Sequence, residues 1–313
     1  MVFAVKSCLL TGLLLVVASA VLQGQVAVSA IDQSRLFQPV PAAAPVSAVD
    51  ANGNSLGDTT NVEDDSFGAQ MILKDQERAR HFSLSGGNSL YYTSNVALTR
   101  RDALDDIFAV VNAAGTWTRR LHPEVELQVG LQASMFRYNR ESQLDFNDLG
   151  AGLGLSWTPQ RWSGVSIFGR YDFTELFDRH GREILRDHQF SLGAQKVFVL
   201  GRAHAFSLGT LGSVGISTPF AAQRDQAGIF AGYHLQLTRI LATDLLYRIT
   251  GQSYSDSNRL DLNQVVSWTL RCRFAEWGEA NLYYSYGDNR SNTSVFDYSV
   301  TSGGGGFGIT TRF

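Results

Sequence analysis

The sequence predicts an all-β protein: a transmembrane antiparallel up-and-down β-barrel of about twelve strands, preceded by a disordered N-terminal linker. Three observations support this fold class. Only one apolar run approaches the length of a membrane helix, so any further membrane crossing requires strands. From His81 to the end, apolar residues alternate with small or polar ones at a period of two. The polar positions hold mostly Gly, Ser, Asn, Gln and Thr, which suit an enclosed lumen better than the free surface of a soluble barrel.

Residues 1–30 have the pattern of a secretory signal peptide. Lys6 precedes an apolar run over residues 8–22, and small-residue cleavage patterns end at Ala20 and at Ala30. The alternative is an uncleaved anchor helix, but the run is shorter than the roughly 20 residues that span a bilayer. The mature chain is therefore expected to begin after one of these two alanines.

Residues 31–80 are predicted to form a mobile periplasmic linker. They are rich in Ala, Pro, Ser, Asp and Asn and too poor in bulky apolar residues to build a core. Residues 71–80 fit either a short helix or more linker. Cleavage would remove Cys8 and leave Cys272 alone, which excludes an intramolecular disulfide and a cysteine-based metal cluster.

Residues 81–313 are predicted to form the barrel. In the clearest strand, Val125, Leu127, Val129 and Leu131 alternate with Glu126, Gln128 and Gly130. Leu131, Leu153 and Ile229 are expected to face lipid, whereas Gln132, Gly152 and Gly232 face the lumen. The expected strands are 82–98, 106–119, 124–138, 148–158, 164–174, 188–199, 204–217, 226–238, 240–251, 261–274, 279–287 and 300–313.

Short turns are expected to alternate with longer charged loops, as in membrane barrels. The longer loops are expected at 99–105, 139–147, 175–187, 218–225, 252–260 and 288–299. Trp117, Trp157, Trp162 and Trp277 fall at or near the short turns, where an interfacial aromatic girdle would lie. An even number of strands brings both chain ends to the same side of the membrane.

The C-terminal residues 308–313 resemble the assembly signal of bacterial outer-membrane β-barrel proteins. Gly308 and the terminal Phe313 match that signal, whereas Thr311 stands where a hydrophobic residue is usual. The resemblance implies insertion into the outer membrane of a Gram-negative bacterium by the barrel-assembly machinery, with N- and C-termini in the periplasm. It also implies contact with outer-membrane lipid and lipopolysaccharide. Residues 91–96 are similar to the first strand of barrels in export and surface-assembly proteins.

No residue pattern makes a convincing enzyme. His81, Ser83 and Asn95 resemble the His-x-Ser and downstream Asn of outer-membrane phospholipase A, but the residues that flank the serine in that family are absent. The remaining histidines are scattered and the acidic loops match no calcium motif. We therefore expect no catalytic residue, metal or cofactor. The net charge of −3 gives no electrostatic case for nucleic acid.

Charged residues at lumen-facing positions are the candidate functional set. Two interpretations remain open: these charges pair across strands and fill the interior, or some of them line an aqueous path and set its selectivity. Twelve strands lie between the filled eight-strand barrels and the open sixteen-strand porins. The main candidates are Arg170, Asp172, Asp244, Arg248 and Arg271, and the wider set adds Glu124, Glu126, Arg273 and Arg312.

These observations predict an outer-membrane barrel that is a porin-like channel for small solutes. The alternative is a scaffold or export component that engages a periplasmic protein through the linker 31–80. A third, weaker interpretation is an outer-membrane lipid hydrolase.

Overall fold

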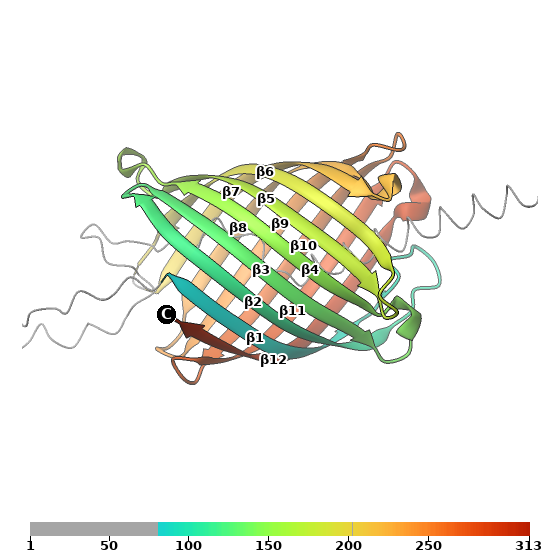
Figure 1. Cartoon of the computed structure of the whole chain (residues 1–313), viewed down its shortest axis with the longest axis horizontal. Helices are drawn as coiled ribbons and strands as arrows, with labels where there is room; N and C mark the ends of the chain where they lie inside the picture. Colours follow the sequence, from blue (N-terminus) through green and yellow to red (C-terminus); the bar gives the residue numbers. More distant parts are fainter. Residues whose placement is uncertain (1–80, 202) are drawn as a thin grey trace, which may run out of the picture.

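In the computed structural model, which describes residues 81–201 and 203–313, the chain forms one closed barrel of twelve antiparallel strands (Figure 1). Each strand pairs with its neighbours in sequence, which confirms the up-and-down order. The predicted signal peptide, its two candidate cleavage sites, the predicted linker and the helix considered at 71–80 lie outside the described residues. The strands are β1 (Phe82–Thr93), β2 (Asp106–His122), β3 (Val125–Tyr138), β4 (Phe146–Trp157), β5 (Val165–Asp178), β6 (Glu183–Val199), β7 (His204–Thr218), β8 (Arg224–Gln236), β9 (Leu241–Tyr254), β10 (Leu260–Arg273), β11 (Gly278–Ser291) and β12 (Tyr298–Arg312).

Pairing of β1 with β12 closes the barrel. Their register runs from Ser83 opposite Arg312 to Thr93 opposite Ser302, so the sheet has no open edge. Glycines of β12 allow the two strands to approach at this seam. A Cβ at Gly304 would collide with the Leu90 carbonyl oxygen, and one at Gly306 with the Ser89 side chain. The run of glycines in the last strand therefore relieves crowding where the barrel closes.

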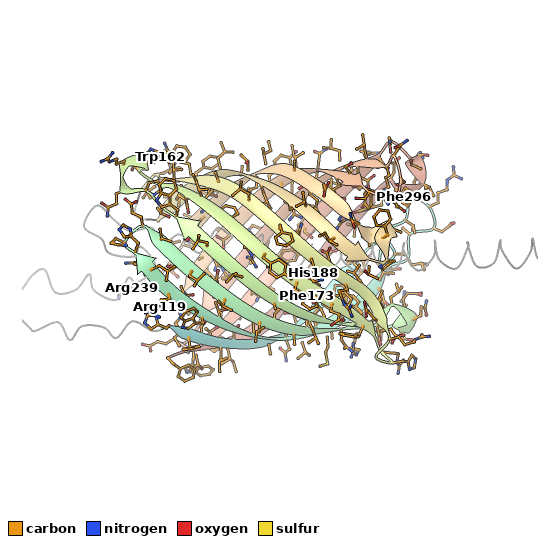
Figure 2. The ribbon with its side chains drawn as sticks, turned by 45° about the horizontal axis from the view of Figure 1, so that its top comes forward. Arg119, Trp162, Phe173, His188, Arg239 and Phe296 are labelled. Carbon is orange, nitrogen blue, oxygen red and sulfur yellow. The ribbon has the colours of Figure 1, made fainter. Side chains whose placement is uncertain are left out.

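The two faces of the strands follow the predicted alternation. Leu131, Leu153 and Ile229 are exposed on the outer wall. Residues of the opposite parity face inward: a Cβ at Gly152 would lie 3.0 Å from Asp172 Oδ1, and one at Gly232 would meet the Ser207 hydroxyl. Large apolar side chains cover the outer wall all round the barrel (Figure 2). Such a continuous apolar belt is unstable in water and matches the lipid-facing band of a membrane barrel.

Tryptophans mark the end of the barrel where residues 81 and 313 lie. Trp157 and Trp162 have ring centroids 5.5 Å apart, Trp117 lies 6.4 Å from Phe82, and Trp277 packs edge-on to Phe274. The short turns therefore carry aromatic rings at one rim, as predicted, and Trp162 projects there in Figure 2.

Glu124 is not in the lumen, contrary to the prediction. It lies in the turn between β2 and β3, where it accepts hydrogen bonds from the Gln160 backbone N–H at 3.0 Å and the Trp157 indole N–H at 3.2 Å. These donors, Gln160 first, hold the pKa of the Glu124 carboxyl below its usual value. Glu124 therefore helps to fix the aromatic rim.

Several predicted strand and loop boundaries were wrong. The expected loop 175–187 is mostly strand, because β5 and β6 continue to a tight connection over residues 179–182. Its charges form pairs along the hairpin: Arg186 binds Glu175 at 2.9 Å, and Arg182 binds Asp178 at 2.7 Å. Likewise β9 and β11 extend into their expected loops, whereas β1 ends five residues early. Connections at the two ends therefore differ less in length than predicted.

The mouth opposite the chain ends holds an apolar core inside the barrel. It forms where β2 to β6 reach this mouth, and its buried members are Val96, Phe108, Phe136, Tyr138, Phe146, Leu176, Leu185 and Ala222. A second buried cluster contains Leu98, Val265, Tyr298 and Val300. The loop 94–105 contributes Val96 to the first cluster and Leu98 to the second, so it folds inward between them. No helix in the described residues is long and apolar enough to cross a bilayer.

The alternation can be tested with adjacent residues of β3. Leu131 is 65% exposed on the outer wall, and Gln132 faces the interior. Leu131→Arg is expected to destabilise the barrel by about 2–4 kcal/mol, because it places a charge in the lipid-facing band. Gln132→Arg should cost much less, since its side chain can reach the polar interior. Denaturant unfolding in lipid vesicles would measure both, and equal losses would contradict the assigned faces.

Candidate functional site

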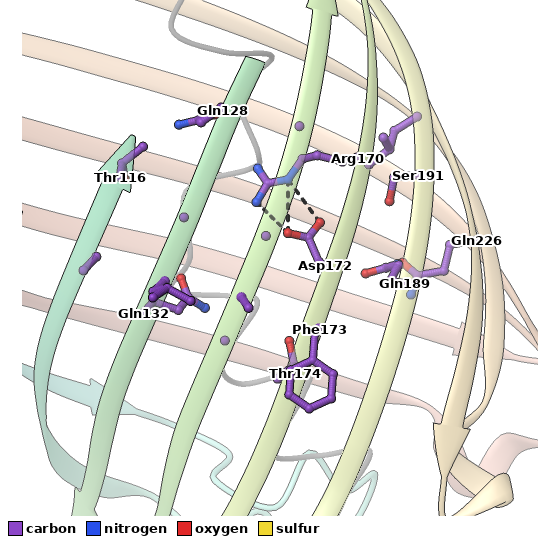
Figure 3. Close-up of a pocket in the computed structure, with 18 of the residues that line it drawn as sticks. Thr116, Gln128, Gln132, Arg170, Asp172, Phe173, Thr174, Gln189, Ser191 and Gln226 are labelled. Carbon is purple, nitrogen blue, oxygen red and sulfur yellow. Dashed lines mark hydrogen bonds and ion pairs between the residues drawn. The ribbon is translucent and has the colours of Figure 1, made fainter. Parts of the chain in front are cut away.

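A polar cavity of about 220 Å³ lies in the lumen near the middle of the barrel (Figure 3). It is bounded mainly by β2 to β6, with contributions from β7, β8 and β9. Its lumen-facing polar side chains are Thr116, Gln128, Gln132, Arg170, Asp172, Thr174, Gln189, Ser191, Gln226 and Arg248.

Glycines of β4 form one wall of this cavity. Gly150, Gly152 and Gly154 occupy successive lumen-facing positions, where any side chain would fill the space. A Cβ at Gly150 would lie 2.7 Å from the Gln132 side chain, and one at Gly152 would lie 3.0 Å from Asp172 Oδ1. The glycine wall therefore makes room for the polar side chains of β3 and β5.

Arg170 and Asp172 form an ion pair on the β5 wall of the cavity. They are two residues apart on β5, so both point inward. Arg170 Nη2 lies 2.7 Å from Asp172 Oδ1, and Arg170 Nε donates to both carboxylate oxygens at 3.1 Å. Arg248 reaches the same cavity from β9. Three of the five main lumen candidates thus share one cavity, with a formal charge sum of +1.

The other two candidates form a separate cluster. Arg271 on β10 binds Asp244 on β9 through Nη2 at 2.6 Å and Nε at 3.0 Å. His234 Nδ1 lies 2.8 Å from the other Asp244 oxygen. Asp244 is near the start of β9, so this cluster lies closer to the mouth with the chain ends than the central cavity does. His234 was missed as a candidate, although its lumen-facing parity and its register opposite Asp244 would indicate this contact.

Two phenylalanines also face the lumen. Phe230, which breaks the alternation in the sequence, is buried against Gly209 of β7, and Phe168 is buried against Gly193 of β6. In each case a Cβ on the glycine would collide with the ring. A glycine on the adjacent strand therefore leaves room for each ring to lie against the lumen side of the sheet.

Asn95 fixes the loop 94–105 in the mouth opposite the chain ends, which we call the far mouth. The Asn95 amide donates to the carbonyl oxygens of Thr99 at 2.7 Å and Ser299 at 3.1 Å, and its Oδ1 accepts from the Thr99 backbone N–H. The Val96 N–H donates to Leu104 at 2.8 Å across the loop. The polar groups of the loop are satisfied while its apolar side chains enter the two clusters.

Arg259 braces the same mouth from the other side of the barrel. Its guanidinium lies 4.0 Å from the Tyr254 ring centre and 3.6 Å from that of Phe296, and it binds the buried carboxylate of Asp261. Asn289 also donates to Asp261 at 3.2 Å. A buried charge held by two rings and a carboxylate joins three neighbouring strands and their connections.

The residues of the enzyme-like pattern do not meet. His81 and Ser83 lie at the start of β1, and Asn95 follows its far end, so about 12 residues of strand separate them at ~3.3 Å each. His188, also considered from sequence, faces outward and shares a hydrogen bond of 2.8 Å with the Tyr171 hydroxyl (Figure 2). Among residues 81–201 and 203–313, no group of three or more His, Cys, Asp or Glu could hold a metal.

The residues of the predicted assembly signal lie on β12 and just beyond it. Gly308 pairs with Gly87 of β1. The Phe313 backbone exchanges hydrogen bonds with Phe82, and its ring is exposed at the rim with the tryptophans.

Comparisons with known proteins show the fold. No family model and no curated protein sequence matches the chain. The structure is similar to the COG4313 outer-membrane channel from Pseudomonas putida F1, with a TM-score of 0.50, 10% identity and coverage of 74% of this chain and 96% of that one. Weaker similarity, with TM-scores of 0.42 and 0.41, links it to the translocator domain of the autotransporter NalP from Neisseria meningitidis and to an OmpT loop-deletion mutant from Vibrio cholerae. Their identities are both 10%; the alignments cover 75% and 74% of this chain and 90% and 98% of theirs. The chain thus has the fold of outer-membrane β-barrel proteins.

Proposed function

We propose that this outer-membrane β-barrel is a channel through which small polar solutes cross the membrane. The observation that carries the proposal is the polar cavity in the middle of the lumen, at the depth where the outer wall is apolar. Amide, hydroxyl and charged side chains there can replace the water that a solute loses on entry.

The charges of the central cavity would bias which ions pass. Arg170 and Asp172 largely compensate each other, whereas Arg248 adds one positive charge to the same cavity. Charges act strongly on ions in a narrow passage with low-dielectric walls. The cavity is therefore expected to admit anions somewhat more readily than cations.

The far mouth is expected to limit the flow. Apolar clusters and the loop 94–105 occupy it, so an open path there must be narrow. This feature also supports the second candidate function, a scaffold or export component with a closed lumen. In that case the linker 31–80 would bind a periplasmic partner, and the barrel would conduct no ions.

The aromatic rim, the exposed ring of Phe313 and the two chain ends of the barrel lie together. We assign this end to the periplasm and the mouth with loop 94–105 to the cell surface. The outer wall would then contact phospholipid in the inner leaflet and lipopolysaccharide in the outer one.

Conductance tests the channel directly. Purified protein in a planar bilayer should show small discrete current steps. Replacing Val96 and Leu98 with Gly should enlarge those steps, because the loop loses its apolar contacts with both clusters. Leu104→Gly, which removes an exposed apolar side chain of the same loop outside both clusters, is the matched control. Heat-modifiable gel mobility would verify that the wild-type protein and the loop variant are folded. Absence of current in both folded proteins would favour the scaffold function.

Selectivity tests the central arginines. The double substitution Arg170→Gln and Arg248→Gln is expected to shift the reversal potential in a KCl gradient toward cation preference. It removes two positive charges and leaves Asp172 without its partner. Arg290→Gln, on the exposed outer wall, should leave the potential unchanged. Current steps with the same selectivity in both variants would show that ions do not pass these arginines.

The terminal residue tests the assembly signal. Deletion of Phe313 should slow insertion and leave unfolded precursor in the periplasm, because the aromatic end of the last strand is removed. Pulse labelling followed by heat-modifiable mobility would measure the folded fraction over time. Phe307→Leu, a change elsewhere on the lipid-facing side of β12, provides the control. An unchanged rate after Phe313 deletion would show that this residue is not the recognition element.

A further inference from the structure

The central cavity also indicates which solutes the channel would favour. We propose that it is a binding site for neutral, hydroxyl-rich solutes of about monosaccharide size. This inference rests on the proposed channel function and adds a substrate class to it. Three features of the cavity support it: an ion pair that is already satisfied, an excess of neutral hydrogen-bonding groups, and a bare backbone wall.

Arg170 and Asp172, two of the three charges in the cavity, satisfy each other, and Arg248 is the third. Arg170 makes three hydrogen bonds to Asp172, which is close to the full capacity of a side-on guanidinium–carboxylate contact. A charged solute would have to break this pair to bind either partner, and that would leave the other charge poorly compensated. A neutral solute can hydrogen-bond to the outside of the pair without breaking it.

Four neutral amides also line the cavity, and one of them, Gln189, already donates through Nε2 to the Ser213 hydroxyl at 2.7 Å. Gln128 and Gln132 on β3 lie to one side of the ion pair, and Gln189 and Gln226 lie to the other side (Figure 3). Each amide carries a donor and an acceptor, and so does each hydroxyl of a sugar. A sugar ring with several hydroxyls could therefore form hydrogen bonds with amides on both sides of the cavity. A simple ion would use only the donors or only the acceptors of these amides.

The β4 glycine wall suits a ring-shaped solute. With no side chains at Gly150, Gly152 and Gly154, the face of a sugar ring can approach the backbone closely.

The experiment compares three ring-shaped solutes of nearly equal size: glucose, its anionic analogue glucuronate and its cationic analogue glucosamine. Uptake into proteoliposomes would be measured at equal concentrations, with KCl conductance recorded on the same preparation. Glucose is expected to enter several-fold faster than either charged analogue and to reduce the KCl current by occupying the cavity. Equal rates would indicate an unselective pore, and a faster rate for glucuronate or glucosamine would indicate a charge-selective one. Each of these results overturns the inference about the solute, whereas a measurable KCl conductance would still support the channel function.

Glutamine variants test the site itself. Gln132→Leu combined with Gln189→Leu removes a hydrogen-bonding group from each side of the cavity and should lower glucose uptake about tenfold. Gln264→Leu is the matched control, because Gln264 faces the outer wall and bonds to the Tyr247 hydroxyl. Equal glucose uptake in the double variant and the control would show that glucose binds outside this cavity. Absence of conductance in the wild-type protein would instead refute the channel function. If the double variant does not fold, the comparison of solutes in the wild-type protein still decides.

Discussion

The structure depends on one requirement: inside a bilayer, every backbone N–H and C=O must find a partner within the protein. A helix meets this requirement alone, but a sheet meets it only when its first and last strands join. Here β1 and β12 pair along their whole length, and glycines at the seam let their backbones approach. Closure then fixes the even strand count, the meeting of the two chain ends at one rim and the enclosed lumen.

Closure also divides each strand between two solvents. Apolar side chains are stable against lipid, and polar side chains are stable in the lumen. Neighbouring residues such as Leu131 and Gln132 therefore need different chemistry. The polarity of the lumen also varies along the barrel axis. Paired charges and amides occupy its middle, whereas aromatic and aliphatic side chains fill the mouth far from the chain ends. This division allows an apolar constriction and a polar cavity to coexist within one barrel.

Sequence reasoning predicted what is local and missed what depends on distant pairing. A period of two is visible in any single strand, so the strand number, the lipid-facing residues and the inward direction of Arg170 and Asp172 could be derived. The inward fold of loop 94–105 depends on Asn95 reaching Ser299 and on Val96 and Leu98 entering two separate clusters. Nothing within that loop signals these contacts. The β5–β6 hairpin was mistaken for a loop because its charges looked solvated, although they pair across the strands.

The fit of Phe230 against Gly209, and of Phe168 against Gly193, has a consequence for how wide this passage can be. At those levels the bore is set by a large and a small residue on adjacent strands and not by either alone. A bulkier residue in place of either glycine would push a ring into the path, and a smaller one in place of the ring would widen it. Such exchanges leave the outer wall and the strand register untouched. The calibre of the barrel can therefore change one position at a time, independently of the surface that holds it in the membrane.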